Sequence, residues 1–284
     1  MMKRAKSILV VIERTAGAAA LLRKSVGLAR ALHAKLEMFL CDSEQAFVLG
    51  HAYAREGVLA ARAAAVASAR TYLSELREAA RVTEVDIVID AQCESPLYES
   101  VVRKALRSAP DLVVKAVESA DPNDWQLIRT CPVTLMLSRT RHWREPARFA
   151  AAIDVSEVEP EPLARSALEA AVMLSQAFGA ELHAVYAESK SDEHSGGRLA
   201  KLRRLCGETG VALERTHVLT GTAESCLHEF VRRQGFDALV LGALAHRAGG
   251  ITPVGTLTSR LLDELECDFI LVKAPRYRSP VAST

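Results

Sequence analysis

The 284-residue sequence contains no apolar run of about 18 residues, the length that a membrane-spanning helix requires. It also lacks any block of five or more basic residues, and its formal net charge is only +1. Nothing therefore favours electrostatic binding of nucleic acid or of an anionic membrane. The N-terminal segment "MMKRAKSILVVIERT" has a basic start, but its apolar run is too short for a signal peptide. We expect a cytoplasmic protein with neither nucleic-acid nor membrane partners.

Paired metal-ligand motifs are also missing. The six cysteines form no CxxC pair, and the eight histidines show no HxH or HxxxH spacing. A dedicated metal site is therefore not expected. In a cytoplasmic chain of this size we interpret the cysteines as reduced thiols that pack as small apolar residues.

What the sequence does contain is an internal repeat. The segment "ESPLYESVVRKA" (94–105) matches "ESCLHEFVRRQG" (224–235), and "CPVTLML" (131–137) matches "CDFILVK" (267–273). The repeating unit is about 140 residues long, which indicates a duplicated domain and not a solenoid repeat. We predict one domain at residues 1–141 and a second at residues 148–284.

Each copy alternates short apolar runs with amphipathic helical stretches. The expected strands are "ILVVIE", "LEMFLC", "VDIVID", "DLVVK" and "VTLMLS" in the first copy, and "FAAAID", "LHAVYA", "RTHVLT", "DALVLG" and "DFILVK" in the second. Continuous apolar strands between helices are typical of a parallel sheet that is buried on both faces. The order βαβαβαβαβ predicts an α/β fold in each copy, a doubly wound, Rossmann-like sheet of five parallel strands.

A glycine-containing segment, "LGALAHRAGGITPVGTLTSRLL" (241–262), overlaps the end of the fourth strand of the second copy. In such sheets ligands bind beyond the carboxyl ends of the strands. Gly255 and Thr256 would present free backbone N–H groups at the start of the next helix, where an anion is stabilised. The spacing from Gly250 to Gly255 is that of a P-loop, but Thr256 stands where the lysine should be. The P-loop interpretation is therefore rejected.

A different loop pattern fits this segment. Gly242, Ala245, Gly255 and Thr256 fall on the four positions of a GxxGx9G[ST] loop, with alanine in place of the second glycine, and the strand end "AAID" places Asp154 in the same half. The sequence resembles the universal stress protein family in this loop, with one domain in each half of the chain. The ending "DW…LxRxCP" in the first half resembles the E-type tandem members. The resemblance implies an adenine nucleotide alpha hydrolase-like fold, with Asp154 near an adenine.

The resemblance also implies a nucleotide site in the second domain, with ATP as its candidate ligand. The candidate binding residues are Ile153, Asp154, Ala187, Gly242, Ala245, His246, Arg247, Gly255, Thr256 and Leu257. His246 and Arg247 either face a phosphate or are ordinary solvated loop residues. The methyl group of Ala245 disfavours a positive φ by about 1 kcal/mol. We therefore expect the loop to keep the spacing of a phosphate-binding loop but to wrap a phosphate less tightly.

The corresponding loop of the first domain is shorter. Asp237 and Cys267 are 30 positions apart, whereas Asp111 and Cys131 are only 20 apart, and every glycine of the loop is lost with the missing residues. The segment carries charged residues instead: Lys115, Glu118 and Asp121. We predict that the first domain binds no nucleotide.

A catalytic site is not expected. Ser225, His228 and Glu229 share a helix face, but the repeat places Tyr98 where the histidine stands. No oxyanion hole is marked, and the HxGH and KMSKS motifs of related adenylyltransferases are missing.

The resemblance implies a non-enzymatic cytoplasmic protein that supports survival under starvation, oxidative or DNA-damaging stress by binding a ligand or a partner. One alternative is an ATP-binding, weakly hydrolysing switch in the second domain, and another is a carrier of lipid-like molecules. We expect the two domains to form an intramolecular pseudo-dimer through their last strands, residues 134–138 and 269–273. A homodimer is also compatible with the resemblance.

Overall fold

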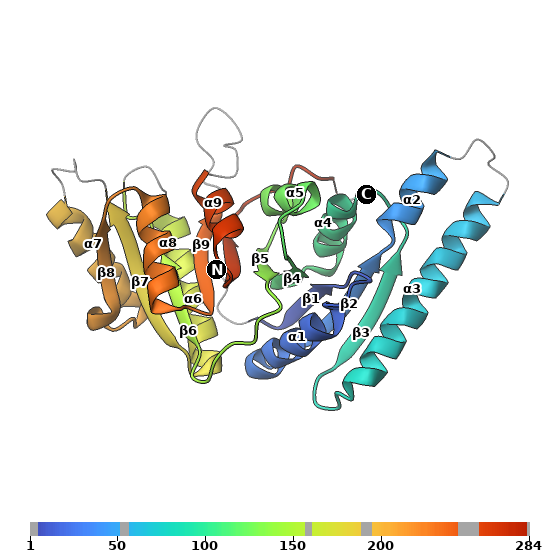
Figure 1. Ribbon diagram of the computed structural model, residues 1–284, viewed down its shortest axis with the longest axis horizontal. Coiled ribbons are helices and arrows are strands. Elements are labelled where there is room, and N and C mark those ends of the chain that lie inside the picture. Colours follow the sequence, from blue (N-terminus) through green and yellow to red (C-terminus); the bar gives the residue numbers. More distant parts are fainter. Residues whose placement is uncertain (1–4, 52–56, 157–160, 189–194, 244–255, 283–284) are drawn as a thin grey trace. The chain divides into compact units, whose positions relative to one another are not determined.

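The computed structural model describes residues 5–51, 57–156, 161–188, 195–243 and 256–282 (Figure 1). The chain divides into two compact units. The first unit comprises residues 5–135 and 278–282, and the second unit comprises Met136–Tyr277. Within the described residues, no helix has the length and apolar character needed to cross a bilayer. The boundaries at residues 141 and 148, and the packing of the last strands against each other, stay predictions.

In the first half of the chain the strand order is β3-β2-β1-β4-β5, and the pairs β3–β2, β2–β1 and β1–β4 are parallel. Its elements are β1 (Ser7–Val11), α1 (Ala18–Leu32), β2 (Lys35–Cys41), α2 (Ser43–Gly50), α3 (Val58–Ala80), β3 (Ile87–Gln92), α4 (Leu97–Ser108), β4 (Leu112–Ala116), α5 (Pro122–Thr130) and β5 (Thr134–Ser138). The boundary between the two units falls inside β5.

The second half repeats this arrangement, with the strand order β10-β9-β6-β7-β8 and parallel pairing throughout. Its elements are β6 (Arg148–Ala152), α6 (Glu161–Phe178), β7 (Glu181–Glu188), α7 (Ser195–Thr209), the 3-10 helix η1 (Leu213–Arg215), β8 (Thr216–Thr220), α8 (Ala223–Gln234), β9 (Ala238–Ala243), α9 (Thr256–Glu264) and β10 (Asp268–Lys273). The predicted fold class, two tandem doubly wound sheets, is confirmed.

Helices cover the two faces of each sheet. Helix α1 contacts α3 and α4 contacts α5 in the first half, and α6 contacts α7 and α8 contacts α9 in the second. In Figure 1, α6 and α8 lie on opposite faces of the second sheet. The strands nearest the middle of each sheet, such as β4 and β9, are therefore almost wholly buried, which explains their continuous apolar sequences.

An aspartate marks the same position in both sheets. Asp111 stands just before β4, and its Oδ2 accepts hydrogen bonds from the backbone N–H groups of Lys6 at 2.7 Å and Ser7 at 3.1 Å. Asp237 stands just before β9, and its Oδ2 accepts a hydrogen bond from the backbone N–H of Arg148 at 2.9 Å. Each carboxylate fastens the start of the first strand of its half to the fourth, so the duplication seen in the sequence extends to individual contacts.

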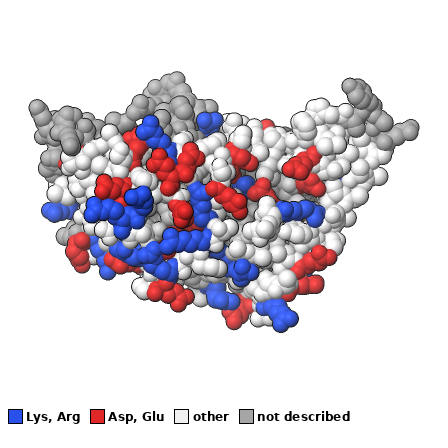
Figure 2. Space-filling view, in the orientation of Figure 1, with Lys and Arg blue, Asp and Glu red and all other residues white. Residues whose placement is uncertain are grey.

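The surface charge is mixed. On the face shown in Figure 2, basic and acidic side chains are interspersed. Many charged side chains of the protein pair with each other, for example Arg30 with Glu84 at 2.8 Å and Arg233 with Glu229 at 3.2 Å.

All six cysteines are free, and five of them are buried: Cys41, Cys93, Cys131, Cys206 and Cys267. Burial, together with the nearby carboxylate of Asp268, raises the pKa of Cys267 to about 12. Because the thiolate is the reactive form, the buried thiols should react slowly. Cys226 is the half-exposed exception.

We therefore expect one fast-reacting thiol per native chain when the protein is treated with a thiol-specific disulfide reagent. Cys226→Ser should remove the fast phase, and Cys206→Ser should leave it intact. Six thiols should react after denaturation. A second fast thiol in the native protein would contradict this assignment.

Candidate functional site

The strand order of the second unit reverses between β9 and β6, and this switch point gathers part of the predicted nucleotide site. The chain runs from β6 outward to β8 and then returns to β9 on the other side of β6. The carboxyl ends of β9, β6 and β7 are therefore neighbours. Ligands of open α/β sheets bind beyond strand ends at such a point.

Four of the predicted residues meet at these strand ends. Ile153 and Asp154 directly follow β6, Ala187 lies near the end of β7, and Gly242 is in β9. The register pairs the last residue of β6 with Val185 of β7 and with Leu241 of β9. A hydrogen bond of 2.9 Å from the Ile153 N–H to the Val185 carbonyl continues this alignment past the strand.

The remaining predicted residues belong to the loop after β9 and to the helix that follows it. Ala245, His246, Arg247 and Gly255 lie outside the described residues. Thr256 is the first residue of α9, and Leu257, the second, is half-buried. A helix therefore begins where the sequence predicts one, at the end of the glycine-containing segment.

Asp154 is half-buried at the end of β6 and is held in a tight local turn. Its Oδ1 accepts a hydrogen bond of 2.8 Å from the backbone N–H of Ser156. One carboxylate oxygen is thus committed to the protein backbone, so Asp154 is positioned before any ligand arrives.

Helix α7 contributes functional candidates that the sequence reasoning missed. The Lys201 Nζ donates to the backbone carbonyl of Val155 at 3.1 Å, directly after Asp154. Burial raises the pKa of the Tyr186 hydroxyl, and a hydrogen bond from Arg198 partly offsets this effect. Arg198 and Lys201 are three residues apart and lie on the same helix face, which is a signal that the sequence could have given. They place two cations near the strand ends of β6 and β7.

In the first unit the equivalent switch point, between β1 and β4, contains a buried cation. The Lys115 side chain is buried, with 4% of the residue exposed. Its Nζ lies 2.8 Å from Glu13 Oε2 and 3.0 Å from Asp124 Oδ1, and it donates to the Ala116 carbonyl at 3.3 Å. Burial alone would lower the pKa of Lys115, but the carboxylates of Asp124 and Glu13 outweigh burial and raise it. The ammonium group is therefore charged and internally neutralised.

The two halves can be compared residue by residue at this point. Val11 of β1 is paired with Lys115 of β4. Ala152 of β6, its counterpart in the repeat, is paired with Leu241 of β9. Lys115 thus occupies the place of an apolar residue of the second half.

The acidic residues of the two halves also correspond. Glu13 follows β1 as Asp154 follows β6, because the residues before them, Ile12 and Ile153, make matching backbone hydrogen bonds of 2.8 and 2.9 Å to the neighbouring strand. In the first unit this carboxylate is bound to Lys115.

The loop of the first unit is as short as predicted. Only residues 117–121 separate β4 from α5, and Asp121 caps α5 by accepting from the Asp124 N–H at 2.8 Å. The Asp124 Oδ2 in return accepts from the Asp121 N–H at 3.1 Å, which completes a capping box. The helix start is thereby satisfied by its own side chains.

The described residues offer little for catalysis. They contain no group of three or more histidine, cysteine or acidic side chains that could hold a metal ion. His228 lies 3.7 Å from Glu264, and the Ser225 N–H is capped by Thr222. At the second switch point the described residues supply backbone groups, one carboxylate and two nearby cations.

No protein-family model matches the sequence. Universal stress protein E of Escherichia coli K12 is 21% identical over 307 residues, which cover 97% of this chain and 96% of the relative.

Solved structures give the same result for the fold. A putative universal stress protein from Pseudomonas aeruginosa UCBPP-PA14 superposes with a TM-score of 0.70 at 21% identity, covering 96% of this chain and 94% of the other. A universal stress protein from Archaeoglobus fulgidus superposes with a TM-score of 0.68 at 13% identity, covering 96% and 98%. The likeness therefore extends over both units.

Proposed function

We propose that this chain, whose resemblance to tandem universal stress proteins is confirmed in sequence and in fold, is a non-enzymatic stress-response protein. It acts in the cytoplasm by binding an anionic ligand, with an adenine nucleotide as the first candidate, at the switch point of its second unit. The first unit binds no nucleotide and serves as the structural partner of the second.

The observation that carries this proposal is the difference between the two switch points. In the first unit, Lys115 supplies a buried positive charge that neutralises Glu13. In the second unit the apolar Leu241 takes the place of that lysine, and Asp154 takes the place of the glutamate. This difference supports a ligand site at the second switch point, because only there is the carboxylate not bound to a buried lysine.

The charges around the second switch point support an anionic ligand. The positive end of the α9 dipole lies at Thr256, and Lys201 and Arg198 add two cations on α7. Among the described residues no group of three or more histidine, cysteine or acidic side chains could hold a metal ion, and this favours binding over metal-assisted hydrolysis.

Equilibrium dialysis with labelled ATP and AMP tests the proposal. We expect saturable binding of one nucleotide per chain. Gly255→Trp should abolish this binding, because it introduces a bulky indole at the position directly before the first residue of α9. Asp154→Ala should weaken it about tenfold, since roughly 1.4 kcal/mol corresponds to a tenfold change in affinity.

The matched control is Glu13→Ala, which removes the equivalent carboxylate of the first unit and should leave the affinity unchanged. Mass spectrometry of the protein purified without added ligand reports any other bound molecule. If wild-type protein binds no nucleotide and carries no anionic ligand, the proposal fails. Phosphate release that survives purification and is lost in Asp154→Ala would instead establish the ATP-hydrolysing switch.

A further inference from the structure

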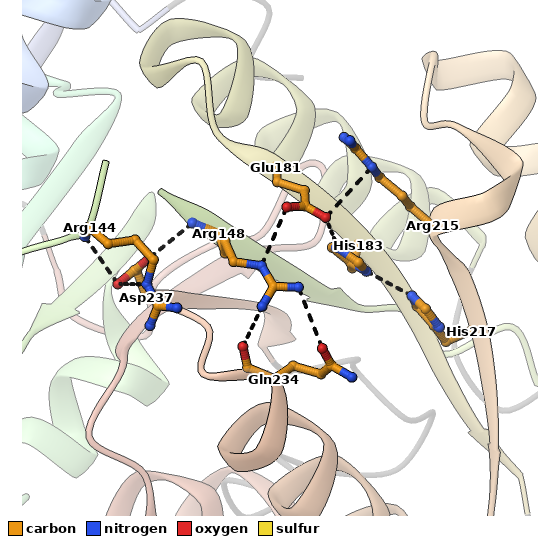
Figure 3. A network of polar contacts seen from close by, with 8 residues as sticks. All are labelled: Arg144, Arg148, Glu181, His183, Arg215, His217, Gln234 and Asp237. Atoms are coloured by element: carbon orange, nitrogen blue, oxygen red, sulfur yellow. Dashed lines mark hydrogen bonds and ion pairs between the residues drawn. The ribbon is translucent and has the colours of Figure 1, made fainter. Parts of the chain in front are cut away.

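A chain of three titratable side chains joins β8, the edge strand of the second unit, to its neighbour β7 (Figure 3). His183 of β7 lies between Glu181 of the same strand and His217 of the edge strand β8. Its Nε2 is 2.7 Å from Glu181 Oε1, and its Nδ1 is 2.8 Å from His217 Nε2. The two imidazole rings are stacked, with centroids 5.0 Å apart and an interplanar angle of 13°.

Aromatic residues enclose the histidine pair. Phe236 packs edge-on against His183 at 5.2 Å, and Phe230 of α8 lies 5.0 Å from His217. His183 is 8% exposed and His217 is half-buried. Charges added to this pair are therefore poorly solvated, and their effect on the local fold is larger than at the surface.

Charged groups approach the pair from the surrounding elements. Arg148 of β6 and Arg215 of η1 lie 3.4 and 3.9 Å from the Glu181 carboxylate, and Asp237 binds the Arg148 backbone. The α8 charges next to Phe230, Glu229 and Arg233, pair with each other at 3.2 Å. Glu181 is thus the one carboxylate among these groups that contacts the histidine pair directly.

The histidine pair has two protonation states in which its hydrogen bonds are satisfied. When both rings are neutral, His183 donates from Nε2 to Glu181 and accepts at Nδ1 from His217. When one proton is added to the pair, one ring nitrogen still donates to the lone pair of the other, and Glu181 balances the charge. The hydrogen bond between the rings therefore persists in both states.

A third proton state breaks the arrangement. If both rings are protonated, two N–H donors face each other across 2.8 Å. Two positively charged rings are then stacked on each other, and the Glu181 carboxylate can balance only one of the two charges. Burial lowers the pKa of His217, and the charge of His183 lowers it further. Glu181 has a lowered pKa because it accepts the His183 hydrogen bond, so it stays ionised and favours the first proton over the second.

We propose that Glu181, His183 and His217 form a pH-operated latch that fastens the edge strand β8 to β7 and opens when the second imidazole is protonated. The edge strand has a neighbour on one side only in the described sheet, and the helices α7 and α8 also pack against it. Between β8 and α8 lies a hollow of about 490 Å³ whose lining includes Val218, Phe230 and Arg233. Release of the latch loosens the strand and helix that border this hollow.

The direction of the pH dependence follows from linkage. In the open state His217 has the ordinary histidine pKa of about 6.5, whereas in the closed state its pKa is lower. The open state therefore binds more protons below about pH 6.5, and the closed state loses stability as the pH falls from there to the pKa of the closed state. Above about pH 6.5 the latch is fully closed.

Amide hydrogen exchange of the full chain tests the latch. Between about pH 8 and about pH 5, after correction for intrinsic exchange, the protection of β8 amides should fall by more than about twofold, because the open state binds protons more tightly than the closed state. The amides of the central strand β9 should keep their protection. His217→Gln retains a side-chain donor for His183 Nδ1 but cannot titrate, and its β8 protection should change less than twofold, within about 0.4 kcal/mol.

The matched control is His228→Gln, which removes a half-buried histidine of α8 outside the latch and should behave as wild type. Equal pH dependence of β8 protection in wild type and His217→Gln would overturn the latch. Should His217→Gln fail to fold, nitrogen chemical shifts of the wild-type histidines decide the question. Two separate protonation steps for the pair are expected, and a single step common to both rings would overturn the proposal.

Discussion

Lys115→Met is expected to lower the free energy of unfolding of the first unit by about 3–5 kcal/mol. The substitution keeps much of the side-chain volume but removes the charge that neutralises Asp124, whose side chain is 3% exposed. A buried carboxylate without its partner is far more costly than an exposed one. Glu13 is less affected, because its side chain is 35% exposed and can turn to solvent.

Urea unfolding followed by circular dichroism measures this loss, and amide exchange of β1 and β4 assigns it to the first unit. Burial already raises the pKa of Asp124 in the native protein, and loss of the ammonium group, which lowers this pKa, raises it further. The deficit of the variant should therefore be largest near neutral pH and should shrink as the pH falls and the carboxyl group takes up a proton.

Two further variants make the interpretation specific. Lys104→Met removes a lysine that also contacts two carboxylates, Glu37 at 2.6 Å and Asp90 at 2.9 Å, but these are more exposed than Asp124. Its cost should be less than half that of Lys115→Met. Adding Asp124→Leu to Lys115→Met should recover most of the loss, apart from about 1 kcal/mol for the missing helix cap. A cost below about 1 kcal/mol for Lys115→Met would show that the ion pair is not needed.

The sequence predicts the sheets well because their signal is local. Each strand is a short apolar run, and each crossover helix carries an apolar stripe, so order and type follow from spacing alone. The internal repeat shows the same pattern of strands and helices twice, so each copy supports the fold predicted for the other. The short loop of the first half is also visible in the sequence, since the distance from Asp111 to Cys131 counts its residues directly.

The contacts that distinguish the two switch points are not local. The sequence indicates that Lys115 is out of place in an apolar strand, but its pairing with Glu13 depends on the register of β1 against β4. The histidine latch joins residues 34 positions apart, and neither His183 nor His217 belongs to a recognisable motif. Such contacts require strand pairing that periodicity does not specify.

The candidate nucleotide site can be predicted from the sequence only in part. Four of its residues follow from the rule that ligands bind at strand ends, and the structure brings Ile153, Asp154, Ala187 and Gly242 to neighbouring strand ends. The sequence does not predict the two cations of α7. This helix follows β7, and its position relative to the switch point depends on how it packs on the sheet, which the sequence pattern does not specify.

Asp237→Ala should destabilise the second unit by about 3 kcal/mol, because one buried carboxylate fastens the chain segment that enters its first strand. Asp237 is 3% exposed. It accepts from the backbone N–H of Arg148 at 2.9 Å and of Arg144 at 3.3 Å, and it pairs with the Arg144 Nε at 3.1 Å. Removing it leaves these donors without an acceptor at the start of β6.

The repeat supplies the matched comparison. Asp111→Ala removes the same carboxylate from the first unit, where the residue is half-buried and its backbone partners, at Lys6 and Ser7, lie nearer to solvent. Water replaces part of the lost hydrogen bonding there, so the cost should be only about 1–2 kcal/mol. Asp237→Asn keeps one acceptor but loses the charge, and its cost should fall between the two. Thermal and urea unfolding of the three variants measures the order, and equal costs for Asp237→Ala and Asp111→Ala would show that burial and the Arg144 ion pair add nothing to the shared backbone contact.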